Sequence, residues 1–376
     1  MSFPKLVVRS ILIGVLFWLA PSTAVARQAP QRLSDPEYVR LIARLSEEPG
    51  FFNSDNLISN ESSYLQVLGG LRALRVRDGV YLGVGPEQNF TYIAKTRPHL
   101  AIILDIRRQN LLFHWLLKSL FEMSQNRVEY LSYLFCKALP SKTPLGKKSD
   151  VEHLLTFFEP IPPNPELFKK NLALIESRIR QTHHFPLSAA DGKVIRDMYK
   201  EFFDNQFEIR FRSYGRPMYH FYPSFKEISL EKDLEGHWGN YLNSEEDFHF
   251  LKRLQERNLI IPVIGDFAGP KAVRSIGTYI REMGETVSIF YVSNVEFYLL
   301  QNGAFGQYGE NLKLLPFDEK SLLIRAYFRF PHPERLPGYI SATLLQRVSS
   351  FIQIFDAKQY FSYQELGLRD YIAFKE

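Results

Sequence analysis

Short apolar runs alternate with helical periodicity in two parts of the chain. The first part, residues 80–105, begins with an apolar run over 80–84 and breaks at Gly85-Pro86. A helical segment over 87–94 and a second apolar run over 100–104 follow. Uninterrupted apolar runs of this length indicate strands that are buried on both faces, as in parallel sheets. The pattern therefore predicts a βαβ unit.

The second part, residues 259–297, repeats the pattern. An apolar run over 259–264 precedes a helical segment over 271–283, which Gly284 closes, and another apolar run covers 287–292. Glycine just after a helix takes the left-handed conformation that ends it. The two parts together predict an α/β protein with one Rossmann-like sheet and helices on both of its faces.

Weaker patterns surround these two blocks. Residues 35–45 form a predicted helix after Ser34, and residues 48–63 form a loop that could wall a site. Residues 321–330 alternate like a strand, whereas 340–355 has a helical period. The resulting organisation is a leading helix and loop over 27–63, the first half of the core over 64–138, a mostly helical insertion or lid over 139–250, and the second half of the core with a C-terminal helix over 251–376.

The N-terminus has the features of a secretory signal peptide over residues 1–26. Lys5 and Arg9 precede an apolar run over 10–20, and Ala24-Val25-Ala26 matches a small-x-small cleavage site. The alternative is an uncleaved anchor, although the run is short for a bilayer, which needs about 20 residues. We expect an exported protein, periplasmic or secreted, whose mature chain begins at Arg27. No later run has the roughly 18 apolar residues that a membrane span requires, so we expect no membrane contact after cleavage.

Composition narrows the function classes. The 376 residues are 45% hydrophobic and 23% charged, which is typical of a globular protein. The net charge of +5 comes without a run rich in Lys and Arg, so no nucleic-acid binding is expected. A single cysteine, Cys136, excludes an internal disulfide and a multi-cysteine zinc site, and no histidine pattern predicts a metal site.

Glycines and polar residues follow each predicted core strand. Because the carboxyl ends of parallel strands share one edge, these residues should converge on one crevice and hold a small-molecule ligand there. Asp105 lies 20 residues beyond Gly85, the spacing at which an acid accepts hydrogen bonds from ribose hydroxyls. Arg107 and Arg108 either clamp an anion or form surface ion pairs.

This order of features resembles class I S-adenosylmethionine-dependent methyltransferases. The matching motifs are Gly83-Val84-Gly85 after the first strand, Asp105, Gly265-Asp266 and Ser293-Asn294-Val295-Glu296. The resemblance implies a methyltransferase-type sheet with S-adenosylmethionine as cofactor. The implied cofactor-binding residues are Gly83, Gly85, Glu87, Asn89, Asp105, Arg107, Gly265, Asp266 and Ser293, and the implied catalytic residues are Asn294 and Glu296.

The chain also departs from that pattern and resembles a second group. Tyr81 stands where the methyltransferase loop has an acid, and Glu87-Gln88 where it has a later glycine. The segments 83–90 (Gly-Val-Gly-Pro-x-Gln-Asn-Phe) and 105–108 (Asp-Ile-Arg-Arg) resemble an uncharacterised family of bacterial proteins. Glu87 at a helix N-terminus would oppose a phosphate, so a phosphate-free ligand is expected.

Two functions remain open at this point. The first is methyl transfer from S-adenosylmethionine to an unknown acceptor. The second is a non-catalytic exported binding protein, a pseudo-methyltransferase, which holds a small ligand or a protein segment in the same crevice.

Overall fold

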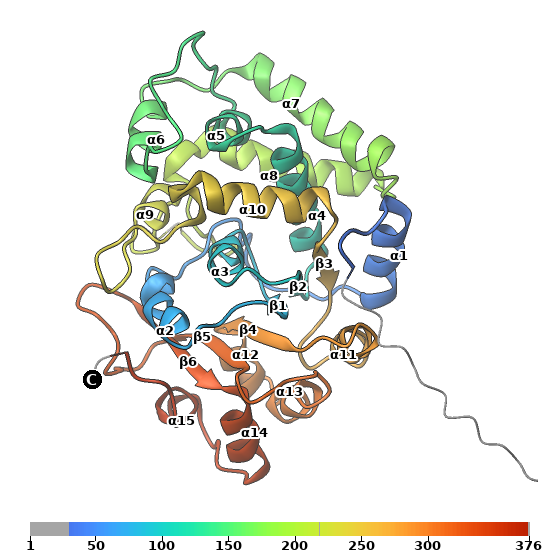
Figure 1. The fold of residues 1–376 in the computed structure, drawn as a ribbon, viewed down its shortest axis with the longest axis vertical. Helices are drawn as coiled ribbons and strands as arrows, with labels where there is room; N and C mark the ends of the chain where they lie inside the picture. The colour runs from blue at the N-terminus through green and yellow to red at the C-terminus, as the bar shows by residue number, and fades with distance from the viewer. Residues whose placement is uncertain (1–29, 218, 375–376) are drawn as a thin grey trace, which may run out of the picture.

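The protein is built around a six-stranded sheet, seen in a computed structural model that describes residues 30–217 and 219–374 (Figure 1). The strands are β1 (Val80–Gly83), β2 (Leu100–Asp105), β3 (Ile260–Ile264), β4 (Val287–Ser293), β5 (Leu322–Phe328) and β6 (Ser341–Arg347). Their order is β3-β2-β1-β4-β5-β6, with β1 to β5 parallel and β6 antiparallel to β5. The α/β prediction is confirmed, and the order is compatible with a Rossmann-like fold. The predicted signal peptide lies outside the described residues.

Strands β1, β2 and β3 are buried along their whole length, which explains their uninterrupted apolar sequences. Helix α3 (Asn89–Thr96) connects β1 to β2, and α11 (Ala272–Glu282) connects β3 to β4. Gly83 of β1 pairs with Ile103 of β2, and Asp105 of β2 pairs with Ile264 of β3. These strands therefore end at one edge, where the loops after them meet.

Helices cover both faces of the sheet. In Figure 1, α4 to α10 gather on one side and α12 to α15 on the other. The first group comprises α4 (Arg108–Met123), α5 (Arg127–Phe135), α6 (Val151–Phe158), α7 (Pro165–Ser177), α8 (Ala189–Asn205), α9 (Phe225–Ser229) and α10 (Glu245–Glu256). The second comprises α12 (Val295–Gln301), α13 (Phe305–Leu312), α14 (Val348–Asp356) and α15 (Tyr363–Leu368). None of the helices in the described ranges is both long and apolar enough to cross a membrane.

The predicted helical insertion over 139–250 shares its core with the sheet. The ring of Phe202 on α8 stacks on Phe113 of α4 with centroids 5.8 Å apart, and Phe248 of α10 stacks on Phe121 of α4 at 5.1 Å. Helix α4 itself follows β2 directly. The inserted helices therefore pack on the sheet through α4.

The helical prediction over 340–355 is wrong in its first half. Residues 341–347 form β6, and α14 begins only at Val348. Six of the seven residues of β6 are buried, on both faces, so the strand lacks an alternating pattern. Its outer edge is partly covered by the chain terminus, since the amide of Ile372 donates to the carbonyl of Leu345 (2.7 Å).

Helix α1 (Asp35–Leu45) forms as predicted, and Ser34 caps it together with Glu37. The hydroxyl of Tyr38 donates to the carbonyl of Ile260 on β3 (2.7 Å), and the Tyr38 ring packs edge-on against Trp115 at 5.3 Å. The helix is therefore fastened to the sheet and to α4.

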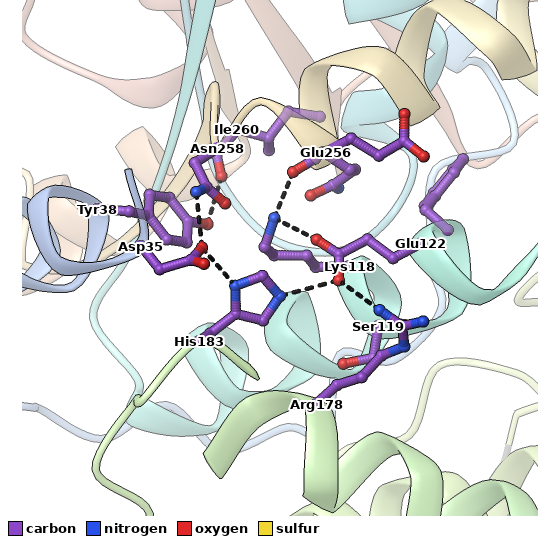
Figure 2. Close-up of polar contacts among 12 residues, drawn as sticks. Asp35, Tyr38, Lys118, Ser119, Glu122, Arg178, His183, Glu256, Asn258 and Ile260 are labelled. Carbon is purple, nitrogen blue, oxygen red and sulfur yellow. Dashed lines mark hydrogen bonds and ion pairs between the residues drawn. The ribbon is translucent and has the colours of Figure 1, made fainter. Parts of the chain in front are cut away.

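Figure 2 shows a buried charge cluster at this junction. His183 places Nδ1 2.7 Å from Asp35 Oδ1 and Nε2 2.9 Å from Glu122 Oε2. Both ring nitrogens therefore lie within hydrogen-bond distance of a carboxylate oxygen, one from α1 and one from α4. Lys118 Nζ lies 2.8 Å from Glu122 Oε1, and Asn258 donates to Asp35 (2.9 Å). The cluster ties α1 to α4 and to the segment after α7.

Candidate functional site

A cavity of about 160 Å³, open to solvent, lies at the carboxyl edge of the sheet. It adjoins the point between β1 and β4 where the strand order reverses, the usual ligand position in open α/β sheets. The predicted site residues that line it are Gly85, Asp105, Arg107, Gly265, Asp266, Ser293 and Asn294. The predicted convergence of the strand ends is confirmed.

Gly83 and Asn89 shape the loop after β1 instead of lining the cavity. A Cβ on Gly83 would lie 2.0 Å from Asn89 Oδ1, so only glycine fits there. Asn89 Nδ2 donates to the carbonyls of Val84 (2.9 Å) and Pro86 (2.7 Å), and its Oδ1 accepts from Tyr81 (2.8 Å). Tyr81, the departure from the methyltransferase pattern, therefore holds the loop through Asn89.

Glu87 is buried and is not among the cavity-lining residues, contrary to the prediction. Burial raises the pKa of its carboxyl to about 8, although the backbone amides of Glu87 and Gln88 hydrogen-bond to it. Its Oε2 has no hydrogen-bond partner among the described residues. The fold therefore favours the neutral form of the Glu87 carboxyl, which lies just before α3.

Asp105 and Arg107 form a buried bidentate ion pair. Arg107 Nε donates to Asp105 Oδ1 (3.0 Å) and Nη2 donates to Oδ2 (2.9 Å), with both side chains about 5% exposed or less. The backbone amide of Arg107 adds a third bond to Oδ1 (2.9 Å). A ligand hydroxyl at Asp105 would have to share these oxygens with the guanidinium.

The segment 46–56, here called the strap, runs across the ends of β2 and β3. Arg107 Nη1 donates to the strap carbonyls of Ser54 (3.1 Å) and Asp55 (3.2 Å). The amide of Gly50 donates to the carbonyl of Ile106 (2.8 Å), and that of Glu47 donates to Ile264 (3.0 Å). The loop predicted as a possible wall thus lies over the strand ends and contributes Phe51, Phe52 and Asn56 to the cavity.

Glu47 of the strap accepts hydrogen bonds from three backbone amides around the start of α11. Its Oε1 accepts from Asp266 (2.8 Å), and its Oε2 accepts from Lys271 and Ala272 (2.9 Å each). The amide-rich loop after β3 therefore already holds a carboxylate from the same chain.

Sequence reasoning missed Glu61, a fully buried carboxyl in the cavity wall. Its Oε1 accepts from Tyr291 (2.7 Å) and from Ser293 Oγ, and its Oε2 accepts from Gln88 (3.0 Å). Burial raises the pKa of Glu61, and these three hydrogen bonds oppose that rise only in part. No local signal marks Glu61, because its partners come from α3 and β4.

Ser293 ends β4 in a left-handed conformation, with φ of 51°. A non-glycine residue in this region is strained, and such strain is common at functional sites. The conformation accompanies the turn of the chain from β4 into α12, and Ser293 reaches Glu61 there.

Glu296, predicted as catalytic, lies outside the cavity lining. It forms a fully buried ion pair with Arg325 on β5, with Nε 2.7 Å from Oε2 and Nη2 3.2 Å from Oε1. The hydroxyl of Tyr308 also donates to Oε1 (3.1 Å). Glu296 therefore joins α12 to β5, and only Asn294 of the predicted catalytic pair faces the cavity.

Aromatic side chains line the cavity and lie beside its mouth. Phe52 packs edge-on against Tyr298 with centroids 4.9 Å apart, and Phe211 also contributes to the lining. Tyr222 is hydrogen-bonded to Asn60 of the lining. The predicted insertion or lid over 139–250 thus contributes Phe211 to the cavity lining and contacts the lining through Tyr222.

One cluster elsewhere has metal-ligand residue types: Asp233, Glu235 and His237. Arg72 already pairs with Asp233 Oδ2 (3.1 Å) and Glu235 Oε1 (2.7 Å). A guanidinium bound to two of the three groups neutralises the charge that a cation would need.

The fold and the site define an α/β protein with a mostly parallel sheet and a cavity of about 160 Å³ where the strand order reverses. The sequence profile of a family described as a domain of unknown function (DUF7790) matches residues 57–141 and 175–370. This match spans more than half of the chain, and the protein belongs to that family. No curated protein matches the sequence. The strap lies outside the matched ranges.

Proposed function

We propose that the protein binds a small organic molecule in the sheet-edge cavity. The observation that carries this proposal is the convergence of polar side chains from four separate segments on one solvent-accessible cavity at the switch point. Buried polar groups are costly to gather unless they are satisfied by one another or by a ligand. Binding without chemistry is favoured, because Asp105 is paired with Arg107 and Glu296 with Arg325.

The size of the cavity bears on how the ligand sits. Small-molecule sites usually have volumes of roughly 300–1,000 Å³, more than the 160 Å³ of this cavity. A ligand as large as a nucleoside must therefore extend out of the cavity or displace part of its lining, such as the strap residues Phe51 and Phe52.

Methyl transfer from S-adenosylmethionine is the second candidate, together with the methyltransferase-type sheet that it implies. It is favoured by the order of cavity-lining residues, with Gly85 after β1, Asp105 ending β2, Gly265-Asp266 after β3 and Ser293-Asn294 after β4. In this proposal Asn294 faces the methyl acceptor, and Asp266 lies near the adenine.

A thermal-shift titration of residues 27–376 separates the two candidates. S-adenosylmethionine and S-adenosylhomocysteine are the probes, with NAD and ATP as controls, since a ligand that binds the native state raises its stability. A saturable shift with the first two alone supports the methyltransferase proposal. No shift with any of them removes that proposal and leaves binding of another small molecule.

We further propose that the protein is exported after removal of residues 1–26. The proposal is supported by the basic, apolar and small-residue succession in that segment. Mass spectrometry of the natively produced protein should find an N-terminus at Arg27. An intact Met1 terminus would refute cleavage.

A further inference from the structure

We propose that the sheet-edge cavity takes a neutral or cationic ligand without phosphate groups, because the protein's own acidic side chains hold the anion-binding positions at this edge. The inference rests on the proposed binding function and names the class of ligand. Three sets of contacts support it.

The first set surrounds Glu47. Amides at the start of a helix that follows a parallel strand commonly bind phosphate. Here the amides of Asp266, Lys271 and Ala272 donate to the two carboxylate oxygens of Glu47, at 2.8–2.9 Å. A Cβ on Gly269 would lie 2.0 Å from Glu47 Oε1, so the glycine makes room for this internal anion. A phosphate at α11 would have to expel the strap.

The second set surrounds Glu87 at the start of α3. Its carboxyl hydrogen-bonds with the amides of Glu87 and Gln88 and is fully buried. A pyrophosphate that approached the glycine loop would find these donors already engaged. The backbone amides after β1 and after β3 are therefore both hydrogen-bonded to glutamate side chains of the same chain.

The third set concerns the arginines. Arg107 donates from Nε and Nη2 to Asp105 and from Nη1 to two strap carbonyls. Arg108 forms a bidentate ion pair with Asp191, with N–O distances of 2.7 and 2.8 Å. Both arginines that were predicted to clamp an anion are therefore already paired with carboxylates of the protein.

The charge of the lining agrees with these contacts. Among the described residues, the lining contains Glu61, Asp105 and Asp266 but only one basic side chain, Arg107. An anionic ligand would therefore lose hydration without gaining a free cation. Arg216 and Arg329 lie close enough to the lining residue Tyr298 for their charges to act on its hydroxyl. Both arginines are exposed to water, which screens their charge. Amides of Asn56, Asn60, Asn294 and Asn302 in the lining suit a ligand with hydroxyl, amide or amine groups.

The test is a titration of the full chain with inorganic phosphate and pyrophosphate at constant ionic strength, followed by calorimetry. The variant Glu47→Ala frees the three amides, and Glu48→Ala is the matched control, because Glu48 is the exposed neighbour. We expect no saturable binding to the wild type or Glu48→Ala, and a gain of at least about tenfold in affinity for Glu47→Ala. Saturable pyrophosphate binding to the wild type overturns the proposal, as does a Glu47→Ala variant that gains none.

Circular dichroism checks that Glu47→Ala is folded, and Glu47→Gln provides a variant of the same shape without the charge. Glu47→Gln should also gain affinity for phosphate and pyrophosphate, but less than Glu47→Ala. A second titration compares adenosine with AMP, which differ by one phosphate. Preference for AMP contradicts the proposal. If neither binds, the nucleoside form of the proposed function fails, whereas the phosphate titration still decides the class of ligand.

Discussion

At the scale of single residues, charged side chains around the cavity are paired with one another. The pair of Asp105 and Arg107 shows this best, since both side chains are buried and each would be left uncompensated without the other. Removing one partner of a buried pair typically costs about 3–5 kcal/mol of stability. The acid that sequence spacing assigns to a ribose therefore also maintains the fold.

We predict that Asp105→Asn and Arg107→Met each lower the free energy of unfolding by about 3 kcal/mol, and that the double variant loses less than the sum. Urea denaturation of the four proteins gives the coupling energy. Asp266→Asn is the control, because Asp266 lines the same cavity without a buried ion pair, and it should cost less than about 1 kcal/mol. Additive losses would contradict the pairing.

Glu87 gives a prediction about pH. Its folded pKa of about 8 exceeds the ordinary glutamate pKa of 4.5, so the fold favours the protonated form. Its contribution to stability is complete below pH 4.5 and is lost as the pH rises through 8. Glu87→Gln, which cannot ionise, should become progressively more stable than the wild type between pH 4.5 and 8.

Urea denaturation at pH 5, 7 and 9 checks this prediction, with the exposed Glu48→Gln as control. The advantage of Glu87→Gln should be near zero at pH 5 and largest at pH 9. An advantage that does not change with pH would mean that Glu87 is ionised in the folded protein.

At the scale of elements, α1 depends on the charge cluster of Figure 2. Burial alone would raise the pKa of Glu122, but the hydrogen bonds and charges of His183 and Lys118 outweigh it and lower the pKa to about 2. A lowered pKa contributes stability above the unfolded value of 4.5, and this contribution is lost as the pH falls towards 2.

We predict that Glu122→Gln is destabilised at pH 7 by about 3 kcal/mol, since it leaves His183 and Lys118 with one carboxylate fewer. The difference from the wild type should shrink as the pH falls from 5 to 2. Thermal unfolding across that range measures it, with the exposed Glu152→Gln as control. A difference that persists at pH 2 would show that the carboxylate charge is not its source.

Strands with uninterrupted apolar runs were predictable from the sequence, whereas the boundary between β6 and α14 was not. The strands near residues 80–84, 100–104, 259–264 and 287–292 are all confirmed, because burial on both faces leaves a plain apolar signature. The same burial misled the prediction at β6. There, Leu344, Leu345 and Val348 continue into the helical spacing of α14, so the boundary at residue 348 has no local mark.

At the scale of the whole molecule, sequence order predicted which strand ends meet but not which distant segments cover them. Seven of the predicted positions after the strands do share the cavity, because topology alone brings them together. The roles of Glu47 and Glu61 depend on contacts with α11 and β4, more than 200 residues away in the chain. Only the folded chain reveals such pairings.

The sheet is open at β6, and this gives the C-terminal residues a protective role. On the outer side of β6, the amide of Ile372 donates to the carbonyl of Leu345, and the side chain of Gln346 donates to the carbonyl of Arg369 (3.1 Å). An uncovered edge strand is a template for pairing with another chain. Removal of residues 369–376 should therefore cause concentration-dependent self-association, measurable by light scattering, whereas a full chain with Ile372→Ala should remain monodisperse at the same concentration. Residues 369–372 would then protect the folded protein against aggregation.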